Sequence, residues 1–181
     1  MALLVGCAAS APPANPLSDL ATPKSVAGPG PYSFDCDAEA GHFREMNIAA
    51  PGGRLRITGR VVFLAVRSTD DWAASATVSV AGRNKMPKVG LQAIVYADAP
   101  EEVQFAIRGM GDAQERTPFL TAFGSEGPTP FIVTLDRSGR LAVTVSGVAA
   151  EMHVAALDQT RVNLFCSTAH VRFSDVIVAT D

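Results

Sequence analysis

Hydrophobic and polar residues alternate along much of this chain, most regularly over residues 130–147, PFIVTLDRSGRLAVTVSG. A period of two predicts strands that bury one face. Opposed residues in a hairpin share a face, so matching the apolar sets on the two sides requires a loop with an odd number of residues. The shortest such loop is Arg137-Ser138-Gly139, with Gly139 in the left-handed conformation. The resulting register pairs Asp136 with Arg140, Leu135 with Leu141, Val133 with Val143, and Phe131 with Val145.

Similar alternation continues through the rest of the chain, with turn residues about every 8–12 positions. Residues 148–158 fit either a short helix or a strand. Gly59 predicts a bulge or bend in a long strand, and a change of phase near Asp175 predicts a second bulge. The other expected strands cover residues 32–36, 42–48, 54–66, 72–81, 89–97, 102–110, 119–123, 162–166 and 170–179.

About ten to twelve short strands without an alternating helix–strand pattern predict an all-β fold, a two-sheet antiparallel sandwich. This number exceeds the ~7–9 strands of an immunoglobulin domain and indicates a jelly roll. The 181 residues, 48% of them apolar, are enough for one domain with a large core. The net charge of −3 gives no basic footprint for nucleic acid. No apolar run approaches the ~20 residues of a membrane-spanning helix.

The three cysteines are Cys7, Cys36 and Cys166, so a single disulfide leaves one thiol over. Cys36 and Cys166 are both in phase with apolar residues of their strands, and both point inward. A bridge between them would close a loop of roughly 130 residues. The alternative is two buried thiols that pack as small hydrophobic residues. We predict the bridge, because the amino terminus indicates export.

The first 31 residues differ in composition from residues 32–181, which form the predicted domain. Leu4-Val5-Gly6-Cys7 resembles the lipobox of bacterial lipoproteins, in which the cysteine is lipidated. The stretch before it has no Lys or Arg and few apolar residues, so either the true start lies upstream or the match is chance. Residues 8–31 are rich in Ala, Pro, Ser and Gly, as in a flexible tether. The expected location is the periplasm or outer membrane, with any membrane contact through a lipid on Cys7.

The hairpin at 130–147, followed by NLFCSTAHVRFSDVIV near the end, resembles the concanavalin A-like lectin and glucanase sandwiches. In the laminin-G-like members a final F-x-D-V strand follows such a hairpin, and here it reads Phe173-Ser174-Asp175-Val176. The resemblance covers residues 32–180. It implies a jelly roll and, in many relatives, carbohydrate binding or cleavage.

Motifs for catalysis or metal binding are absent from the sequence. The E-x-D-x-x-E run of glucanases of this fold does not occur, nor does a G-x-S-x-G elbow. Asp35, Asp37 and Glu39 place oxygens at alternate positions, but Ala40 and Met46 replace the glycine and glutamate of an EF-hand, which favours a polar turn. The three histidines are dispersed. These observations predict a protein that is not an enzyme and has no cofactor and no metal.

The best candidates for a sugar-binding face are residues in the outward, polar phase of their strands, the basic loop from Arg83 to Lys88, and the single tryptophan, Trp72. The phase of Trp72 with Ala74 and Val80 favours a core position for its ring, and the galectin motifs H-x-N-P-R and W-x-x-E-x-R are absent. We predict a non-catalytic binding module whose partner is a glycan. The alternatives are a module that binds an envelope protein and a glycoside hydrolase. The candidate ligand-binding residues are Arg67, Trp72, Arg83, Gln92, Tyr96 and Arg108, with the loop from Arg83 to Lys88.

Overall fold

A computed structural model describes residues 24–26, 30–50, 53–82, 88–110, 121–124, 127–157 and 159–180. The described residues form strands and turns without any helix. In chain order the strands are β1 Lys24–Val26, β2 Tyr32–Asp37, β3 Phe43–Ala49, β4 Leu55–Val66, β5 Ala74–Gly82, β6 Lys88–Val95, β7 Glu102–Met110, β8 Thr121–Gly124, β9 Thr129–Leu135, β10 Arg140–Val145, β11 Val148–His153, β12 Gln159–Ser167 and β13 Ala169–Thr180.

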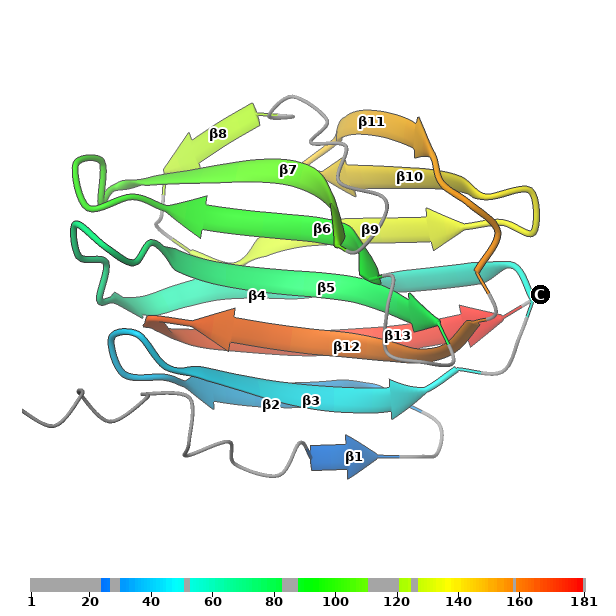
Figure 1. Ribbon diagram of the computed structural model, residues 1–181, viewed down its shortest axis with the longest axis horizontal. Helices are drawn as coiled ribbons and strands as arrows, with labels where there is room; N and C mark the ends of the chain where they lie inside the picture. Colours follow the sequence, from blue (N-terminus) through cyan, green and yellow to red (C-terminus); the bar gives the residue numbers. More distant parts are fainter. Residues whose placement is uncertain are drawn as a thin grey trace, which may run out of the picture.

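The strands form two sheets that lie one over the other (Figure 1). The seven-stranded sheet has the order β1-β3-β12-β5-β6-β7-β8, and the six-stranded sheet has the order β11-β10-β9-β4-β13-β2. All pairings are antiparallel except that of β1 with β3. This architecture confirms the predicted all-β, two-sheet jelly-roll sandwich.

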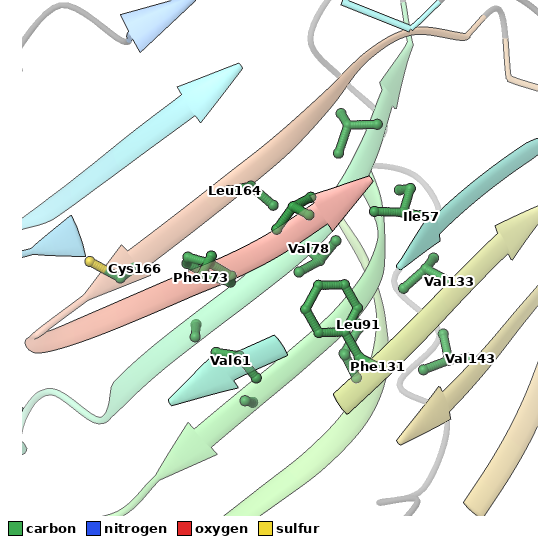
Figure 2. Packing of buried hydrophobic residues seen from close by; sticks show 14 of the residues in the cluster. Ile57, Val61, Val78, Leu91, Phe131, Val133, Val143, Leu164, Cys166 and Phe173 are labelled. Carbon is green, nitrogen blue, oxygen red and sulfur yellow. The ribbon is translucent and has the colours of Figure 1, made fainter. Parts of the chain in front are cut away.

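The inner faces of both sheets share one hydrophobic core (Figure 2). Phe131 and Phe173 of the six-stranded sheet and Leu91 and Leu164 of the seven-stranded sheet are each at most 2% exposed. Burying a side chain of this size contributes about 1.5–3 kcal/mol. The period-two alternation thus reflects one face turned toward the opposite sheet and one turned toward solvent.

The hairpin formed by β9 and β10 has the predicted register, with Leu135 opposite Leu141, Val133 opposite Val143 and Phe131 opposite Val145. The Asp136 amide donates to the Arg140 carbonyl across the turn, and Gly139 has φ of 87°. The odd loop and its left-handed glycine are confirmed. The ambiguous segment that follows forms the strand β11 and not a helix.

The predicted irregularity at Gly59 of β4 falls where β4 and β13 change register. Gly59 pairs in unbroken register with Phe131 of β9, but on its other side Asp175 and Val176 of β13 lie opposite it, between the pairs Ser174–Arg60 and Ile177–Thr58, and Asp175 has φ of 53°. This is the second bulge that the sequence predicts. Gly59 also has a packing role, because a Cβ there would lie 2.8 Å from Cζ of Phe131 and 3.0 Å from a methyl of Val176.

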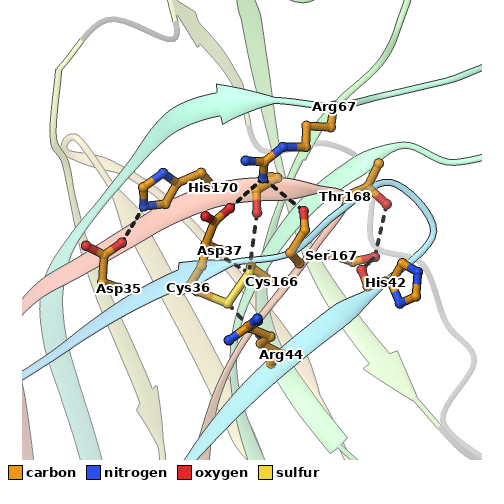
Figure 3. The surroundings of a disulfide bond; sticks show 12 residues. Asp35, Cys36, Asp37, His42, Arg44, Arg67, Cys166, Ser167, Thr168 and His170 are labelled. Carbon is orange, nitrogen blue, oxygen red and sulfur yellow. Dashed lines mark hydrogen bonds and ion pairs between the residues drawn. A yellow bond between two sulfur atoms is a disulfide. The ribbon is translucent and has the colours of Figure 1, made fainter. Parts of the chain in front are cut away.

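Cys36 of β2 and Cys166 of β12 form a disulfide with their Cα atoms 6.1 Å apart (Figure 3). The predicted bridge is therefore present. Because β2 belongs to the six-stranded sheet and β12 to the seven-stranded sheet, the bridge joins the two layers.

The segment expected to form a tether lies mostly outside the described residues, and so does Cys7. Within it, Lys24–Val26 form β1 and pair with β3 at the edge of the seven-stranded sheet. Among the described residues there is no helix with the length and apolar composition needed to cross a membrane.

Candidate functional site

An open groove of about 460 Å³ lies on the outer face of the seven-stranded sheet. Strands β5, β6, β7 and β12 contribute to it, together with the residues just before β5 and just after β6. The groove is lined by Trp72, Ala73, Ser75, Thr77, Ser79, Lys88, Gln92, Ile94, Tyr96, Arg108, Asn163, Phe165 and Ser167.

The floor of the groove is explained by alternation along β5. Ala74, Ala76 and Val78 point into the core, so Ser75, Thr77 and Ser79 face outward. A strand that buries alanine and valine on one face and carries small hydroxyl groups on the other leaves a shallow polar floor for taller side chains of the flanking strands.

One row of residues crosses four strands of this floor. Ser79 of β5 lies opposite Asn163 of β12 on one side and opposite Gly90 of β6 on the other, and Gly90 lies opposite Arg108 of β7. A Cβ at Gly90 would lie 2.1 Å from the carbonyl oxygen of Val78, so a larger residue does not fit there without displacing the backbone. The row therefore has no side chain between Ser79 and Arg108.

Two polar side chains on this floor are buried. Ser79 is 3% exposed, and its hydroxyl has no hydrogen-bond partner in the described structure. Gln92 is 7% exposed and also lines the groove. A buried hydroxyl without a partner costs about 1–3 kcal/mol, and a bound ligand that supplied the partner to Ser79 would recover part of this cost.

An ion pair lies at one end of the groove. The Lys88 ammonium of β6 lies 3.3 Å from Oε2 of Glu45 on β3 and 3.5 Å from Oδ1 of Asn163, so its side chain crosses over β5. The Asn163 amide donates to Glu45 at 2.9 Å and to Asn47 at 3.2 Å. Burial raises the pKa of the Glu45 carboxyl, but the Lys88 charge and the Asn163 hydrogen bond outweigh burial and hold that pKa below its usual range. Glu45 is thus ionised at neutral pH, and its charge balances that of Lys88.

The other end of the groove is aromatic. Trp72 is 51% exposed, which makes the predicted core position of its ring wrong. The backbone of Thr69 and Trp72 exchanges two hydrogen bonds in a turn before β5 begins, and this turn breaks the phase on which the prediction relied. The indole lies against Gly41, and the Tyr96 ring, 36% exposed, lines the same groove just after β6.

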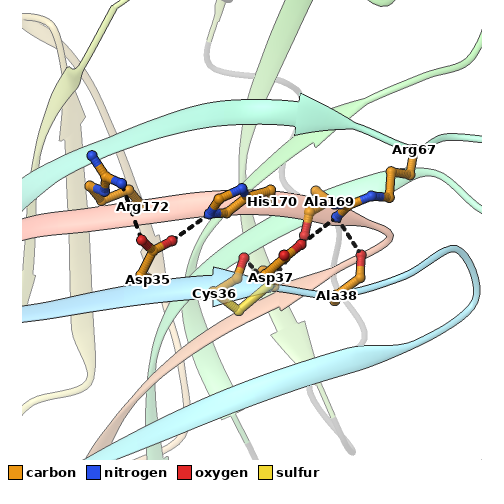
Figure 4. A network of polar contacts seen from close by, with 9 residues as sticks. Asp35, Cys36, Asp37, Ala38, Arg67, Ala169, His170 and Arg172 are labelled. Carbon is orange, nitrogen blue, oxygen red and sulfur yellow. Dashed lines mark hydrogen bonds and ion pairs between the residues drawn. A yellow bond between two sulfur atoms is a disulfide. The ribbon is translucent and has the colours of Figure 1, made fainter.

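Of the six residues proposed from the sequence for a ligand site, the groove brings together four: Trp72, Gln92, Tyr96 and Arg108. Arg83 lies outside the described residues. Arg67 does not line this groove. Its guanidinium pairs with Asp37 at 2.7 Å and donates to the Ala38 carbonyl at 3.0 Å (Figure 4).

The residues of the site that sequence reasoning missed include Ser79, Asn163 and Glu45. The alternation of Ser75, Thr77 and Ser79 was a usable signal for the first of these. Asn163 and Glu45 meet Lys88 only because β3, β12, β5 and β6 are neighbours, and no local pattern gives that order.

A second polar cluster lies on the outer face of the six-stranded sheet beside the disulfide (Figures 3 and 4). Asp35 accepts hydrogen bonds from His170 and from Arg172, and those two contacts lower the pKa of the Asp35 carboxyl. The Arg67 guanidinium pairs with Asp37 and lies 4.0 Å from Glu39. Each of the three acidic side chains that were weighed as a cation loop, Asp35, Asp37 and Glu39, therefore has a basic side chain of the protein beside it. Within the described ranges no group of three or more His, Cys, Asp or Glu side chains could hold a metal ion.

Comparison with known proteins gives no family by sequence. No family model matches the chain, and no curated protein matches it.

Several solved structures are similar in fold at low sequence identity. An alginate lyase from Pseudomonas aeruginosa matches with a TM-score of 0.53 and 18% identity over 71% of this chain, which spans 65% of the lyase. A CBM2 module of the Dit protein from a Lactobacillus casei phage matches with a TM-score of 0.57 and 8% identity, over 86% of this chain and 81% of the module. Scytalido-glutamic peptidase matches with a TM-score of 0.56 and 12% identity, over 81% and 82% of the two chains.

These likenesses correct one expectation. The absence of known motifs predicted that the protein is not an enzyme, but alginate lyases are among the structures that share its fold. A missing glucanase motif argues only against that one chemistry, because unrelated reactions are built on the same sandwich. The chain therefore has the concanavalin A-like β-sandwich fold, shared by carbohydrate-binding modules and by enzymes that cleave polysaccharides.

Proposed function

We propose that the groove on the seven-stranded sheet binds a segment of a polysaccharide. The observation that carries the proposal is the combination of two exposed aromatic rings, Trp72 and Tyr96, with the unpaired Ser79 hydroxyl and the polar Gln92 side chain in one open groove. Aromatic rings offer flat apolar surfaces to the C–H faces of sugars, and fixed polar groups set the orientation of the hydroxyl groups.

The length of the groove favours a polymer over a single sugar. Its lining runs along β5 from Ala73 to Ser79, a rise of about 20 Å at ~3.3 Å per residue. The groove is open, so a chain can extend past both ends. The fold is shared with two carbohydrate-binding modules and with alginate lyases, which supports a polysaccharide ligand without identifying it.

The test is a binding assay of the purified domain against a panel of acidic and neutral polysaccharides. Trp72→Ala should weaken binding at least about tenfold, since a large aromatic contact surface is lost. Ile177→Ala is the matched control, because Ile177 is 49% exposed, like Trp72 at 51%, but lies on β13 of the other sheet. The proposal would be refuted if no polymer binds, or if Trp72→Ala and Ile177→Ala lose equal amounts of binding affinity.

A second candidate function is cleavage of the bound chain by elimination. In this reaction a base removes the proton on the carbon beside a carboxylate, a carbon–carbon double bond forms, and the glycosidic oxygen leaves with a proton. The observation that favours it is the Tyr96 phenol in the groove, which can exchange a proton, on a fold that alginate lyases share. Release of an ultraviolet-absorbing unsaturated sugar from alginate, lost in Tyr96→Phe, would support it. No product from any acidic polymer would overturn it.

We also propose that the domain works outside the cytoplasm, where a buried disulfide such as Cys36–Cys166 persists. Fractionation of the producing cell tests this, and mass spectrometry of the natural product tests lipidation of Cys7. Copurification with an envelope protein, independent of added sugar, would favour protein binding over glycan binding.

A further inference from the structure

We infer that the end of the groove around Ser79, Gln92 and Arg108 is a subsite for one singly charged oxyanion, so that the ligand is an acidic polysaccharide. The inference rests on the proposed function and adds the chemical class of the sugar. The class includes uronate carboxylates and sulfate esters.

The charge balance of the groove points to an anion. Lys88 and Glu45 neutralise one another at 3.3 Å. Arg108 also lines the groove and makes no ion pair with the described residues, so the floor carries one uncompensated positive charge. A ligand with a single negative charge restores neutrality there, and a guanidinium binds planar oxyanions through two parallel hydrogen bonds.

The shape of the floor gives the anion its place. Gly90 separates Ser79 from Arg108 along the same row and has no side chain. A group above Gly90 therefore has the Arg108 side chain from one flanking strand and the Ser79 hydroxyl from the other. Two antiparallel neighbours lie about 4.8 Å apart, so the backbones of β5 and β7 on either side of Gly90 are roughly 10 Å apart.

Polar side chains of the floor supply the donors. The Ser79 hydroxyl is buried without a partner, and a hydroxyl can donate one hydrogen bond. Gln92 lies two residues along β6 from Gly90 on the same face, and its side-chain amide has two N–H donors. Ser79 and Gln92 can each donate or accept, whereas the Arg108 guanidinium can only donate and carries a full charge, so it favours an oxyanion over a neutral sugar hydroxyl.

The groove also has a direction. The aromatic side chains of Trp72 and Tyr96 lie at the opposite end from Lys88, Ser79 and Arg108. A polymer in the groove would stack one sugar on the aromatic end and present the oxyanion of a different sugar to the charged end. The two ends should therefore contribute to binding independently.

The experiment measures binding of the purified domain to three polymers: alginate, the same polymer with its carboxyl groups reduced to alcohols, and a sulfated polysaccharide. Arg108→Gln should weaken alginate binding about 10- to 100-fold, the usual cost of losing a charge-assisted hydrogen bond. Ser79→Ala should weaken it less while leaving the melting temperature unchanged or higher, because it removes an unpaired buried hydroxyl. Trp72→Ala should weaken binding of acidic and neutral polymers alike.

Each outcome has a separate meaning. Binding of alginate that falls on carboxyl reduction and in Arg108→Gln supports the inference, and the sulfated polymer then decides whether a sulfate ester also fits. Equal binding of alginate and its reduced form, with no effect of Arg108→Gln, overturns the oxyanion subsite and leaves the proposed function standing. Binding of none of the polymers overturns the proposed function and the inference with it.

Discussion

Removal of the disulfide should lower the stability of the domain more than any single change in the groove. The change is the double variant Cys36→Ala, Cys166→Ala, which removes the bridge without leaving a free thiol in the core. The bridge links residues 130 positions apart. In the chain-entropy model, closing a loop of this length removes conformational entropy from the unfolded chain and so stabilises the folded state by about 5 kcal/mol.

The loss of about 5 kcal/mol corresponds to a fall in melting temperature of roughly 10–20 °C for a domain of this size. It should be measured as the free energy of unfolding in urea, with the melting temperature as a second reading. Because the unfolded chain without the bridge is more expanded, the dependence of the unfolding free energy on urea should also become steeper.

A double variant that melts within about 2 °C of the wild type, with the same urea dependence, would refute this reasoning. The unfolded chain would then be restricted by something other than the bridge. The single variants are poor controls, because each leaves one thiol available for oxidation. Ile177→Ala serves better, since the Ile177 side chain is exposed and not part of the core.

Two further predictions concern the core and the groove. Gly59→Ala should lower the free energy of unfolding in urea by about 1–3 kcal/mol, because its Cβ would lie 2.8 Å from the Phe131 ring. The control is Gly124→Ala, whose Cβ would meet no atom within 4 Å and which should leave the stability unchanged. Equal effects of the two substitutions would contradict the packing role of Gly59. Glu45→Gln should remove a contribution to stability that is present above the usual carboxyl pKa of 4.5 and lost as pH falls toward the lower pKa of the folded state. The unfolding free energies of wild type and Glu45→Gln should therefore converge in acid, and a difference that persists unchanged there would show that ionised Glu45 is not its source.

The fold could be predicted from local patterns because a sandwich repeats one simple rule. The hairpin register followed from six alternating apolar residues and an odd loop, and the change of phase near Asp175 located a real bulge. Where the rule is broken by a short turn, prediction failed. The turn at Thr69 rotates Trp72 out of the strand, and the hydrogen bonds of that turn leave no trace in the hydrophobic pattern.

The groove was less predictable than the fold. Outward phase alone was enough to propose Gln92, Tyr96 and Arg108. The burial of the Ser79 hydroxyl and the contact of Lys88 with Glu45 depend on strands that are far apart in sequence, so no period along the chain can reveal them. Arg67 faces outward as well, but on the opposite layer, where Asp37 binds it.

The absence of a side chain at Gly90 limits which substitutions this surface can accept during evolution. Any replacement would push against the adjoining main chain, so the floor cannot acquire a new contact there. Altered preference for a ligand has to come from neighbours such as Thr77, Ile94 and Ser75, whose side chains can grow or shrink without moving the sheet. A library designed to redirect the domain to other ligands should keep that glycine and vary those three positions.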